Sequence, residues 1–302
     1  MTEISFLLNG SQVTLAEATA TRTVLDWLRE ERGLKGTKEG CNEGDCGACT
    51  VMVSDTHGTR ALNACILFLP QLHGKALRTV EGLAGSDGSL HPVQRAMIDH
   101  HGSQCGFCTP GFIVTMAVNH LNGERDHDTA LAGNLCRCTG YAPIHRAAEA
   151  AASAPVPDWL QQATAPDSIF SQHPPGEPPK ATADSPPDPF LPKNADALAD
   201  WYANHPDATL IAGATDVGLW VTKQLRDLAP VAFIAGIEDL RGVTVTETDV
   251  RIGAVTPLAE LMPTLAPLHP GLAELIRRYG SAQVRAAATI GGNIANGSPI
   301  GD

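Results

Sequence analysis

The sequence predicts an α+β protein of several domains, and three observations support this prediction. Its 302 residues allow about two domains or three small ones, at roughly 100–200 residues per domain. All eight cysteines lie in the first half, and none follows Cys138. Eleven prolines fall between residues 153 and 192, where few aliphatic side chains are available to form a core. We therefore expect two cysteine-containing domains at residues 1–82 and 83–152, an extended, semi-rigid Pro-rich linker at 153–192, and a mixed α/β region at 193–302.

Charge and composition argue against several classes of partner and location. The chain carries 33 acidic and 21 basic side chains, a formal net charge of −12, so we expect neither nucleic acid nor an anionic membrane surface as a partner. No apolar run approaches the roughly 20 residues that cross a bilayer. The first residues lack the basic and apolar regions of an export signal, so we expect a cytoplasmic protein with reduced thiols rather than a disulfide framework.

The first region predicts strands, one helix and a cysteine-rich loop. Two short strands at residues 4–15 should meet at Asn9-Gly10, because both residues tolerate a positive φ. An apolar stripe predicts a helix from Thr23 to Arg32, which Gly33 would end. Further strands are expected at Thr50–Ser54 and Ala61–Cys65.

The second region predicts helices, with its cysteines at their ends. Pro92 and Pro110 stand where first helical turns would begin. The expected helices are Val93–His101, Gly111–Leu121 and Pro143–Ala152.

The last region mixes strands and helices. Strands are expected at Thr209–Ala212, Val231–Ile237 and Val250–Val255, and helices at Ala195–His205 and Leu272–Tyr279. Residues 290–299 are predicted to be a loop, and because no closing element follows, we expect Asp302 to be an internal position of a longer chain.

Two sets of four cysteines indicate metal chemistry. Cys41-x4-Cys46-x2-Cys49, followed by Cys65, has the spacing of plant-type [2Fe–2S] ferredoxins. Glycines in the loop would let the backbone approach the sulfurs closely. A structural zinc site is the alternative, but zinc sites favour separate Cys-x2–4-Cys pairs.

The second set, Cys105-x2-Cys108 with Cys136-x-Cys138, is less specific. Its spacing leaves open a second [2Fe–2S] cluster, a zinc ion, or a redox-active Cys-x-x-Cys pair.

Two Gly-containing segments could bind phosphate. Leu210–Gly218 and Thr289–Asn293 each resemble an apolar strand that opens into glycine and a hydroxyl or amide residue. Such turns can present backbone N–H groups to phosphate oxygens, although ordinary turns also have this composition. Neither matches Gly-x-Gly-x-x-Gly, so a Rossmann domain is not indicated. The eleven histidines show no metal-ligand spacing.

Four segments together resemble the molybdenum hydroxylases, the family of xanthine dehydrogenase and aldehyde oxidase. These segments are Cys41–Val51, Gln104–Phe112, Gly133–Tyr141, and Thr289–Ile294 with Ser298–Asp302. The resemblance implies a ferredoxin-like β-grasp domain, a four-helix [2Fe–2S] domain, and the start of an FAD-binding domain similar to that of vanillyl-alcohol oxidase. It also implies that both cysteine sets hold [2Fe–2S] clusters.

The resemblance further implies which residues bind the other cofactors. Gln104 would lie next to the molybdopterin of a partner subunit, Tyr279 near the flavin, and Asp302 beside it. The two FAD loops would comprise Leu210, Ile211, Ala212, Gly213, Ala214, Thr215, Asp216 and Val217, and Thr289, Ile290, Gly291, Gly292 and Asn293.

The implied role is electron transfer. The chain resembles the small subunit of bacterial two-subunit xanthine dehydrogenases, which implies a large molybdenum subunit as partner in a heterotetramer. Electrons would pass from molybdenum through the second and then the first cysteine set to FAD and on to NAD+. No catalytic acid or base is expected in this chain. The alternatives are the same role with an aldehyde or another N-heterocycle, a stand-alone ferredoxin-like carrier, and a zinc-containing scaffold.

Overall fold

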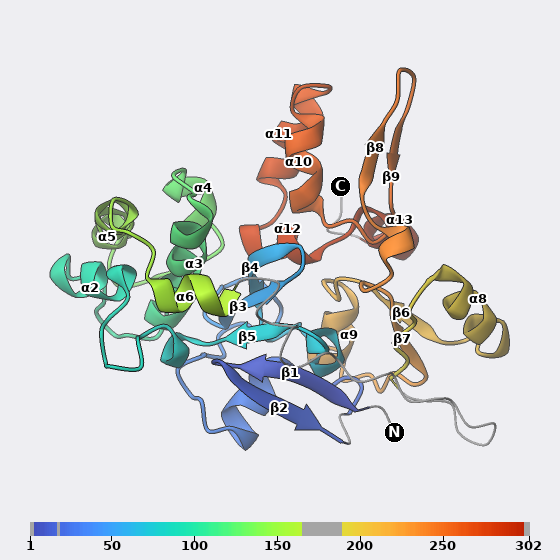
Figure 1. Cartoon of the computed structure of the whole chain (residues 1–302), viewed down its shortest axis with the longest axis horizontal. Helices are drawn as coiled ribbons and strands as arrows, with labels where there is room; N and C mark the ends of the chain where they lie inside the picture. Colours follow the sequence, from blue (N-terminus) through green and yellow to red (C-terminus); the bar gives the residue numbers. More distant parts are fainter. Residues whose placement is uncertain (1–2, 17–18, 165–188, 299–302) are drawn as a thin grey trace.

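The computed structural model describes residues 3–16, 19–164 and 189–298, with the side chains of 162–164 left undescribed. Figure 1 shows a sheet with helices beside it at residues below about 160, and a second α/β part formed by the later residues. The α+β class and its three kinds of domain are as predicted. Asp302 and most of the Pro-rich segment lie outside the described residues.

The first part is a five-stranded mixed sheet in the order β2-β1-β5-β3-β4. β1 and β2 form the predicted hairpin, in which Leu8 pairs with Ser11 while Asn9 and Gly10 have φ of 50° and 87°. β5 pairs parallel with β1 and antiparallel with β3, which gives the β-grasp order. β5 was not predicted from the sequence. The strand predicted at Ala61–Cys65 corresponds to β4, which starts earlier and ends at Asn63. The strands are β1 Ile4–Leu8, β2 Ser11–Leu15, β3 Thr50–Asp55, β4 Gly58–Asn63 and β5 Ala76–Arg78.

Both faces of this sheet are covered, so every residue of β3 is buried. On one face lies the predicted helix, which consists of α1 (Val24–Asp26) and a π-helical turn (Trp27–Glu31). Thr23 caps it by accepting a hydrogen bond from Asp26 N, and buried Trp27 packs edge-on against Phe6. On the other face, Met52 packs with apolar side chains of α3. Short 3-10 turns at Leu69–Leu72 and Val80–Gly82 complete this part.

The helical part contains the three predicted helices and one more. They are α2 (Pro92–Asp99), α3 (Thr109–Asn122), α4 (His127–Leu131) and α5 (Ala142–Ala152). As predicted, Cys105 and Cys108 immediately precede α3, and Cys136 and Cys138 lie in the loop before α5.

The expectation that the whole Pro-rich segment is extended was wrong at its start. Residues Asp158–Thr164 form helix α6, which was not expected because prolines flank it. Leu160 is fully buried against Leu83 and Val118, and Trp159 Nε1 donates to Leu83 O at 3.2 Å. Two bulky apolar side chains are therefore enough to dock this turn of helix on the sheet.

The last part contains the predicted strands and helices in shortened form. It contains two two-stranded sheets, β6-β7 and β8-β9. Several elements were missed, above all the helix that begins at Thr289, where a strand followed by a loop was expected. The elements are α8 Ala195–Asn204, β6 Thr209–Ile211, α9 Val217–Thr222, β7 Val231–Phe233, the 3-10 turn Glu238–Leu240, β8 Val243–Val245, β9 Val250–Ile252, α10 Leu258–Leu265, α11 Pro270–Arg278, α12 Ala282–Ala287 and α13 Ile290–Asn296.

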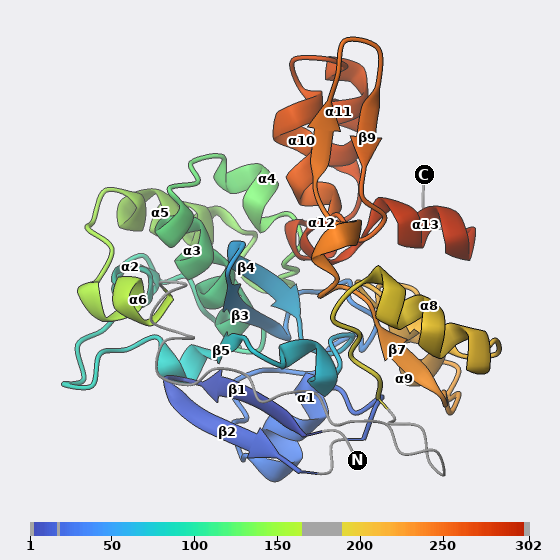
Figure 2. The same ribbon diagram turned by 45° about the vertical axis from the view of Figure 1, so that its right-hand side comes forward.

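The last part rests on the first through α9 and α12. Figure 2 shows α12 beside β4. The five-stranded sheet and the helical part both lie on the β4 side of α12. Ala286 and Ala287 of α12 pack on the core of the sheet. Within the described residues, no helix combines the length and apolar character that a membrane span requires.

Candidate functional site

The first cysteine set gathers in the loop before β3 and at the end of β4. The Cys41 thiol is within hydrogen-bonding reach of Cys46 and Cys65, and Cys65 is within reach of Cys49. Backbone amides point at the sulfurs, with Gly44 N 3.3 Å from Cys65 Sγ and Cys46 N 3.3 Å from Cys41 Sγ. Hydrogen bonds from the neighbouring thiols of Cys46 and Cys65 hold the pKa of Cys41 well below its usual range. The site is thus built to stabilise a thiolate.

The second set lies at the surface of the helical part. Cys105 pairs with Cys138, and Cys108 with Cys136. Cys105 and Cys138 are exposed, whereas Cys136 is buried and its sulfur lies 3.1 Å from Thr139 Oγ1. Burial raises the pKa of the Cys108 thiol to about 12.

In each set, the cysteine thiols therefore lie next to one another in pairs. Two thiolates per iron is the requirement of a four-cysteine [2Fe–2S] cluster, so paired thiols with amides aimed at sulfur fit that group. Among the described residues, no three or more His, Cys, Asp or Glu side chains form a group that could hold a single metal ion.

The two cysteine loops touch each other directly. Leu135 N, next to Cys136, donates to Cys46 O at 3.0 Å. Asn134 Nδ2 donates to Gly47 O at 3.0 Å. Gly47 has a φ of +69°, and a Cβ on it would lie 2.2 Å from Gly133 O, so only glycine fits between the loops. One hydrogen bond thus joins the backbones that carry one ligand candidate from each set.

The two segments predicted to bind FAD come together in the last part. Gly213, which follows β6, approaches the backbone so closely that a Cβ would lie 1.8 Å from Ala287 O. Ser298 Oγ, five residues beyond the second segment, donates to Asp216 Oδ1 of the first at 2.8 Å. Ala214 adopts a φ of +60°, the strained backbone that such close turns require.

The cofactor contacts predicted outside these segments are only partly described. Tyr279, at the end of α11, lies with its hydroxyl 3.5 Å from Asn293 Nδ2 and so joins the second segment. Gln104 is exposed beside Cys105. Asp302 falls outside the described residues.

The first cysteine set also contacts α9, which begins at Val217, the last residue of the first segment predicted to bind FAD. A Cβ on Gly218 of α9 would lie 2.8 Å from Ile66 Cβ, so α9 packs against the residue after Cys65. Lys223, at the end of α9, donates to Cys41 O and lies 3.3 Å from Glu43 Oε2. The structure therefore places the cysteine loops and the FAD segments in one continuous series of contacts.

Sequence reasoning missed the polar residues that join all three parts. Gln283 of α12 is 1% exposed, and its Nε2 donates to Asn134 Oδ1 at 3.0 Å and to Thr115 Oγ1 and Thr50 Oγ1 at 3.2 Å. Thr50 follows Cys49, and Asn134 precedes Cys136 by two residues. No local pattern marks these residues, because their partners lie far apart in sequence.

Comparison with known families and proteins follows the same division. Residues 6–69 match the 2Fe-2S iron-sulfur cluster binding domain, residues 79–149 the [2Fe-2S] binding domain, and residues 188–302 the FAD binding domain in molybdopterin dehydrogenase. The chain is 32% identical over 99% of its length to the xanthine dehydrogenase/oxidase of Mus musculus and 31% identical over its whole length to xanthine dehydrogenase 1 of Arabidopsis thaliana. The chain belongs to the molybdenum hydroxylase family. It is the iron–sulfur and FAD-binding part of such a protein, with two [2Fe–2S] domains and an FAD-binding domain.

Among solved structures, the chain is similar to quinoline 2-oxidoreductase from Pseudomonas putida 86. The identity is 35%, over 49% of this chain and 94% of that chain, with a TM-score of 0.43. It is also similar to the aldehyde oxidoreductase of Desulfovibrio desulfuricans ATCC 27774, at 30% identity, 66% and 21% coverage and a TM-score of 0.46. The chain spans 27% of the mouse relative and 28% of the Arabidopsis relative.

Proposed function

We propose that this chain is the electron-transfer subunit of a xanthine dehydrogenase. It would pass electrons from molybdenum on a partner subunit through two [2Fe–2S] clusters to FAD and NAD+, during oxidation of hypoxanthine or xanthine to urate. The clusters accept and pass on single electrons, whereas FAD collects two and delivers them as a hydride.

The single observation that carries the proposal is the series of contacts from one cysteine set to the other and on to the FAD segments. Leu135 N to Cys46 O links the sets, and packing of Gly218 on Ile66 links the first set to α9. The sequence of these contacts is compatible with the proposed order of electron transfer from the second set through the first to FAD. A stand-alone ferredoxin-like carrier would not need the contact between the first cysteine set and α9.

The proposed ligands are the eight cysteines, four for each cluster. The exposed position of Cys105 and Cys138 supports entry of electrons at the second set, because the cysteines of the first set are half-buried or buried. Three large apolar side chains around it are exposed, Phe107, Leu135 and Tyr141, at 44–52%. Apolar surface of this kind supports a docking site for the molybdenum-containing large subunit, in an assembly of two chains of each kind. Gln104, on the same surface, would lie toward its molybdopterin.

The proposed FAD contacts are the segments 210–217 and 289–293, with Tyr279 and Asp302. Xanthine is the proposed substrate because the first curated relatives are xanthine dehydrogenases. Aldehyde or another N-heterocycle is the second candidate, favoured by the similarity to an aldehyde oxidoreductase. The residues that contact substrate would belong to the partner, and reduced thiols fit a cytoplasmic location.

Low-temperature EPR of the dithionite-reduced full chain tests the cluster assignment. We expect two inequivalent [2Fe–2S] signals of about one spin each. Cys136→Ser should damage the signal of the helical part and leave the other, while Cys65→Ser should do the reverse. Both signals surviving Cys136→Ser at full occupancy would contradict the ligand assignment, and zinc without sulfide would favour the scaffold.

Purification of the native protein tests the partner and the substrate. We expect it to copurify with a molybdenum-containing chain and to reduce NAD+ with xanthine faster than with an aldehyde. An active preparation that contains this chain alone would refute the relay, and a preference for aldehyde would reassign the substrate.

A further inference from the structure

A lysine of the last part reaches the loop that carries the first cysteine set. Lys223 lies at the end of α9, where its ammonium group donates to Cys41 O and lies 3.3 Å from Glu43 Oε2. The carbonyl oxygen and the sulfur of one cysteine are separated by only a few covalent bonds. A positive charge from the last part is therefore held next to a proposed cluster ligand.

The position of this lysine is fixed by the packing of α9 on the sheet. A Cβ on Gly218 would lie 2.8 Å from Ile66 Cβ, which leaves no space for α9 to move closer. Leu219 packs against the core of the sheet, and Lys223 N donates to Leu219 O at 2.9 Å. The backbone of Lys223 is thus held in a defined place beside the cysteine loop.

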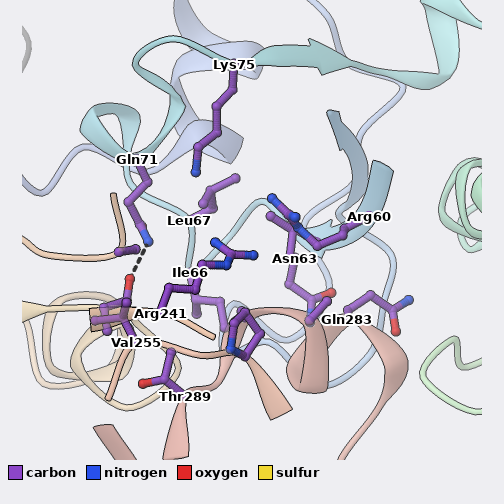
Figure 3. Close-up of a pocket in the computed structure, with 17 residues that line it drawn as sticks. Arg60, Asn63, Ile66, Leu67, Gln71, Lys75, Arg241, Val255, Gln283 and Thr289 are labelled. Carbon is purple, nitrogen blue, oxygen red and sulfur yellow. Dashed lines mark hydrogen bonds between the residues drawn. The ribbon is translucent and has the colours of Figure 1, made fainter. Parts of the chain in front are cut away.

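The same junction holds the first segment predicted to bind FAD against the sheet. Figure 3 shows Ile66, which directly follows Cys65, in the pocket that both parts line, with Gln71 at its edge. Gln71 Nε2 donates to Ala212 O of that segment at 3.0 Å. Docking of the FAD-binding part on the sheet therefore also brings Lys223 to the cysteine loop.

The cysteine loop is acidic, so a cation beside it changes the electrostatic potential at the sulfurs. Between residues 38 and 46 it carries three carboxylates and one basic side chain, namely Glu39, Glu43, Asp45 and Lys38. Reduction adds negative charge to a cluster whose cysteine ligands are already anionic. Nearby carboxylates therefore lower its reduction potential, and a nearby ammonium group raises it.

We propose that Lys223, acting through its contact with Cys41, raises the reduction potential of the cluster held by the first cysteine set. A higher potential there favours the step in which one electron leaves the cluster of the second set, oxidising it, and reduces the cluster of the first, with no bond made or broken. The inference rests on the proposed assignment of Cys41 as a ligand. Because the side chains of Lys223 and Glu43 are 41% and 43% exposed, salt should weaken the effect.

A redox titration of the full chain at low ionic strength, followed by EPR, tests the proposal. The signal that Cys65→Ser removes reports the first cluster. Lys223→Met should make its one-electron reduction three- to tenfold less favourable, a fall in midpoint of about 30–60 mV at 59 mV per tenfold change. The midpoint of the second cluster should not move. Lys223→Arg keeps the charge and should keep the wild-type midpoint.

Two further variants separate the effect of charge from that of structure. Glu43→Gln removes a negative charge from the same loop and should raise the midpoint of the first cluster. Arg251→Met is the control, because it removes an exposed cation on β9, in the hairpin that Figure 1 shows projecting away from the sheet. At about 1 M salt the difference between Lys223→Met and the wild type should shrink.

The signal intensities distinguish the ways in which the proposal can fail. An unchanged midpoint in Lys223→Met at full intensity, equal shifts of both clusters, or a shift as large in the control would overturn it. Loss of the first signal from Lys223→Met, together with an unchanged or lower midpoint in Glu43→Gln, would assign the lysine a structural role instead. A wild-type spectrum that Cys65→Ser leaves intact would refute the ligand assignment itself.

Discussion

At the scale of single residues, the site depends on small side chains where the two cysteine loops meet. Gly47 has a positive φ and packs against Gly133 O. Gly111 of α3 packs against the other side, where a Cβ on Gly111 would lie 2.2 Å from Gly47 O. A side chain larger than hydrogen is thus excluded on both sides of the Gly47 backbone. The electron path of the proposal crosses this contact, so its geometry should be sensitive to one methyl group.

Gly47→Ala tests this sensitivity. The left-handed backbone costs an alanine about 1–2 kcal/mol, and the clash with Gly133 O adds about 1–3 kcal/mol. We expect a loss of about 2–5 kcal/mol in the free energy of unfolding and a weaker magnetic interaction between the clusters by EPR. Gly58→Ala, also at a positive φ but with open space for its Cβ, is the control for the backbone cost alone. Equal losses in both variants would contradict a role for close packing.

Lys75 gives a pH dependence whose sign can be stated. Burial lowers its pKa to about 8 in the folded protein from 10.5 in the unfolded chain. Between these values the unfolded chain binds more protons, so the contribution of Lys75 to stability rises with pH. A shift of this size corresponds to about 3 kcal/mol, and the 28% exposure of the side chain reduces the expected effect to about 1–2 kcal/mol.

Urea unfolding of the wild type and Lys75→Met measures this effect. Lys75→Met should be more stable than the wild type at pH 7. This difference in the free energy of unfolding should shrink by pH 10. A stability difference that stays constant from pH 7 to pH 10 would show that Lys75 titrates normally.

At the scale of elements, the sequence predicted those parts of the fold that local patterns encode. The Asn9-Gly10 hairpin, the helix capped by Thr23, and α3 after Pro110 all depend on turn chemistry, capping or apolar periodicity. β5 has only three residues and exists because it pairs with both β1 and β3. Such elements depend on distant partners, and no local pattern marks them.

The same distinction explains the site. Cysteine spacing and the family resemblance together indicated the ligands before any coordinates, because iron–sulfur chemistry restricts both residue type and spacing. Gln283 could not be identified in this way, since its hydrogen bonds form only where separate parts of the chain pack together. Residues 290–299 were predicted to be a loop, yet Thr289 caps α13 by accepting from Gly292 N at 3.1 Å. Gly291 and Gly292 disfavour a helix, so no local pattern predicts this one.

Helix α6 supplies a prediction at this scale. Leu160 is fully buried between α6 and the sheet, so Leu160→Ala should cost about 2–4 kcal/mol of local stability. Because α6 is a short helix, the loss should appear as faster amide hydrogen exchange in residues 158–161 rather than as global unfolding. Exposed Gln161→Ala is the control. Unchanged exchange in Leu160→Ala would mean that burial of Leu160 does not hold α6 in place.

At the scale of the whole molecule, the parts are joined by a few buried polar contacts. Gln283 links α12 to Thr50 of β3, Thr115 of α3 and the loop at Asn134. Each partner adjoins or supports a cysteine loop, so the FAD-binding part and both cysteine sets share one hydrogen-bond network. The partners of Gln283 keep other contacts, since Asn134 Oδ1 also accepts from Thr115 Oγ1 and Thr50 Oγ1 also accepts from Asn134 Nδ2. Loss of the Gln283 amide therefore removes hydrogen bonds worth about 0.5–1.5 kcal/mol each.

Gln283→Met tests whether this network makes the molecule unfold as one unit, since methionine keeps the volume and removes the amide. In the wild type, flavin release and bleaching of the iron–sulfur absorbance should occur at the same temperature on heating. In Gln283→Met, flavin release should move several degrees lower and separate from cluster loss, because the FAD-binding part loses the hydrogen bonds that Gln283 makes beside both cysteine loops. Gln224→Met, at an exposed position, should keep the two transitions together. Coincident transitions in Gln283→Met would show that apolar packing of Ala286 and Ala287 on the sheet is sufficient to couple the parts.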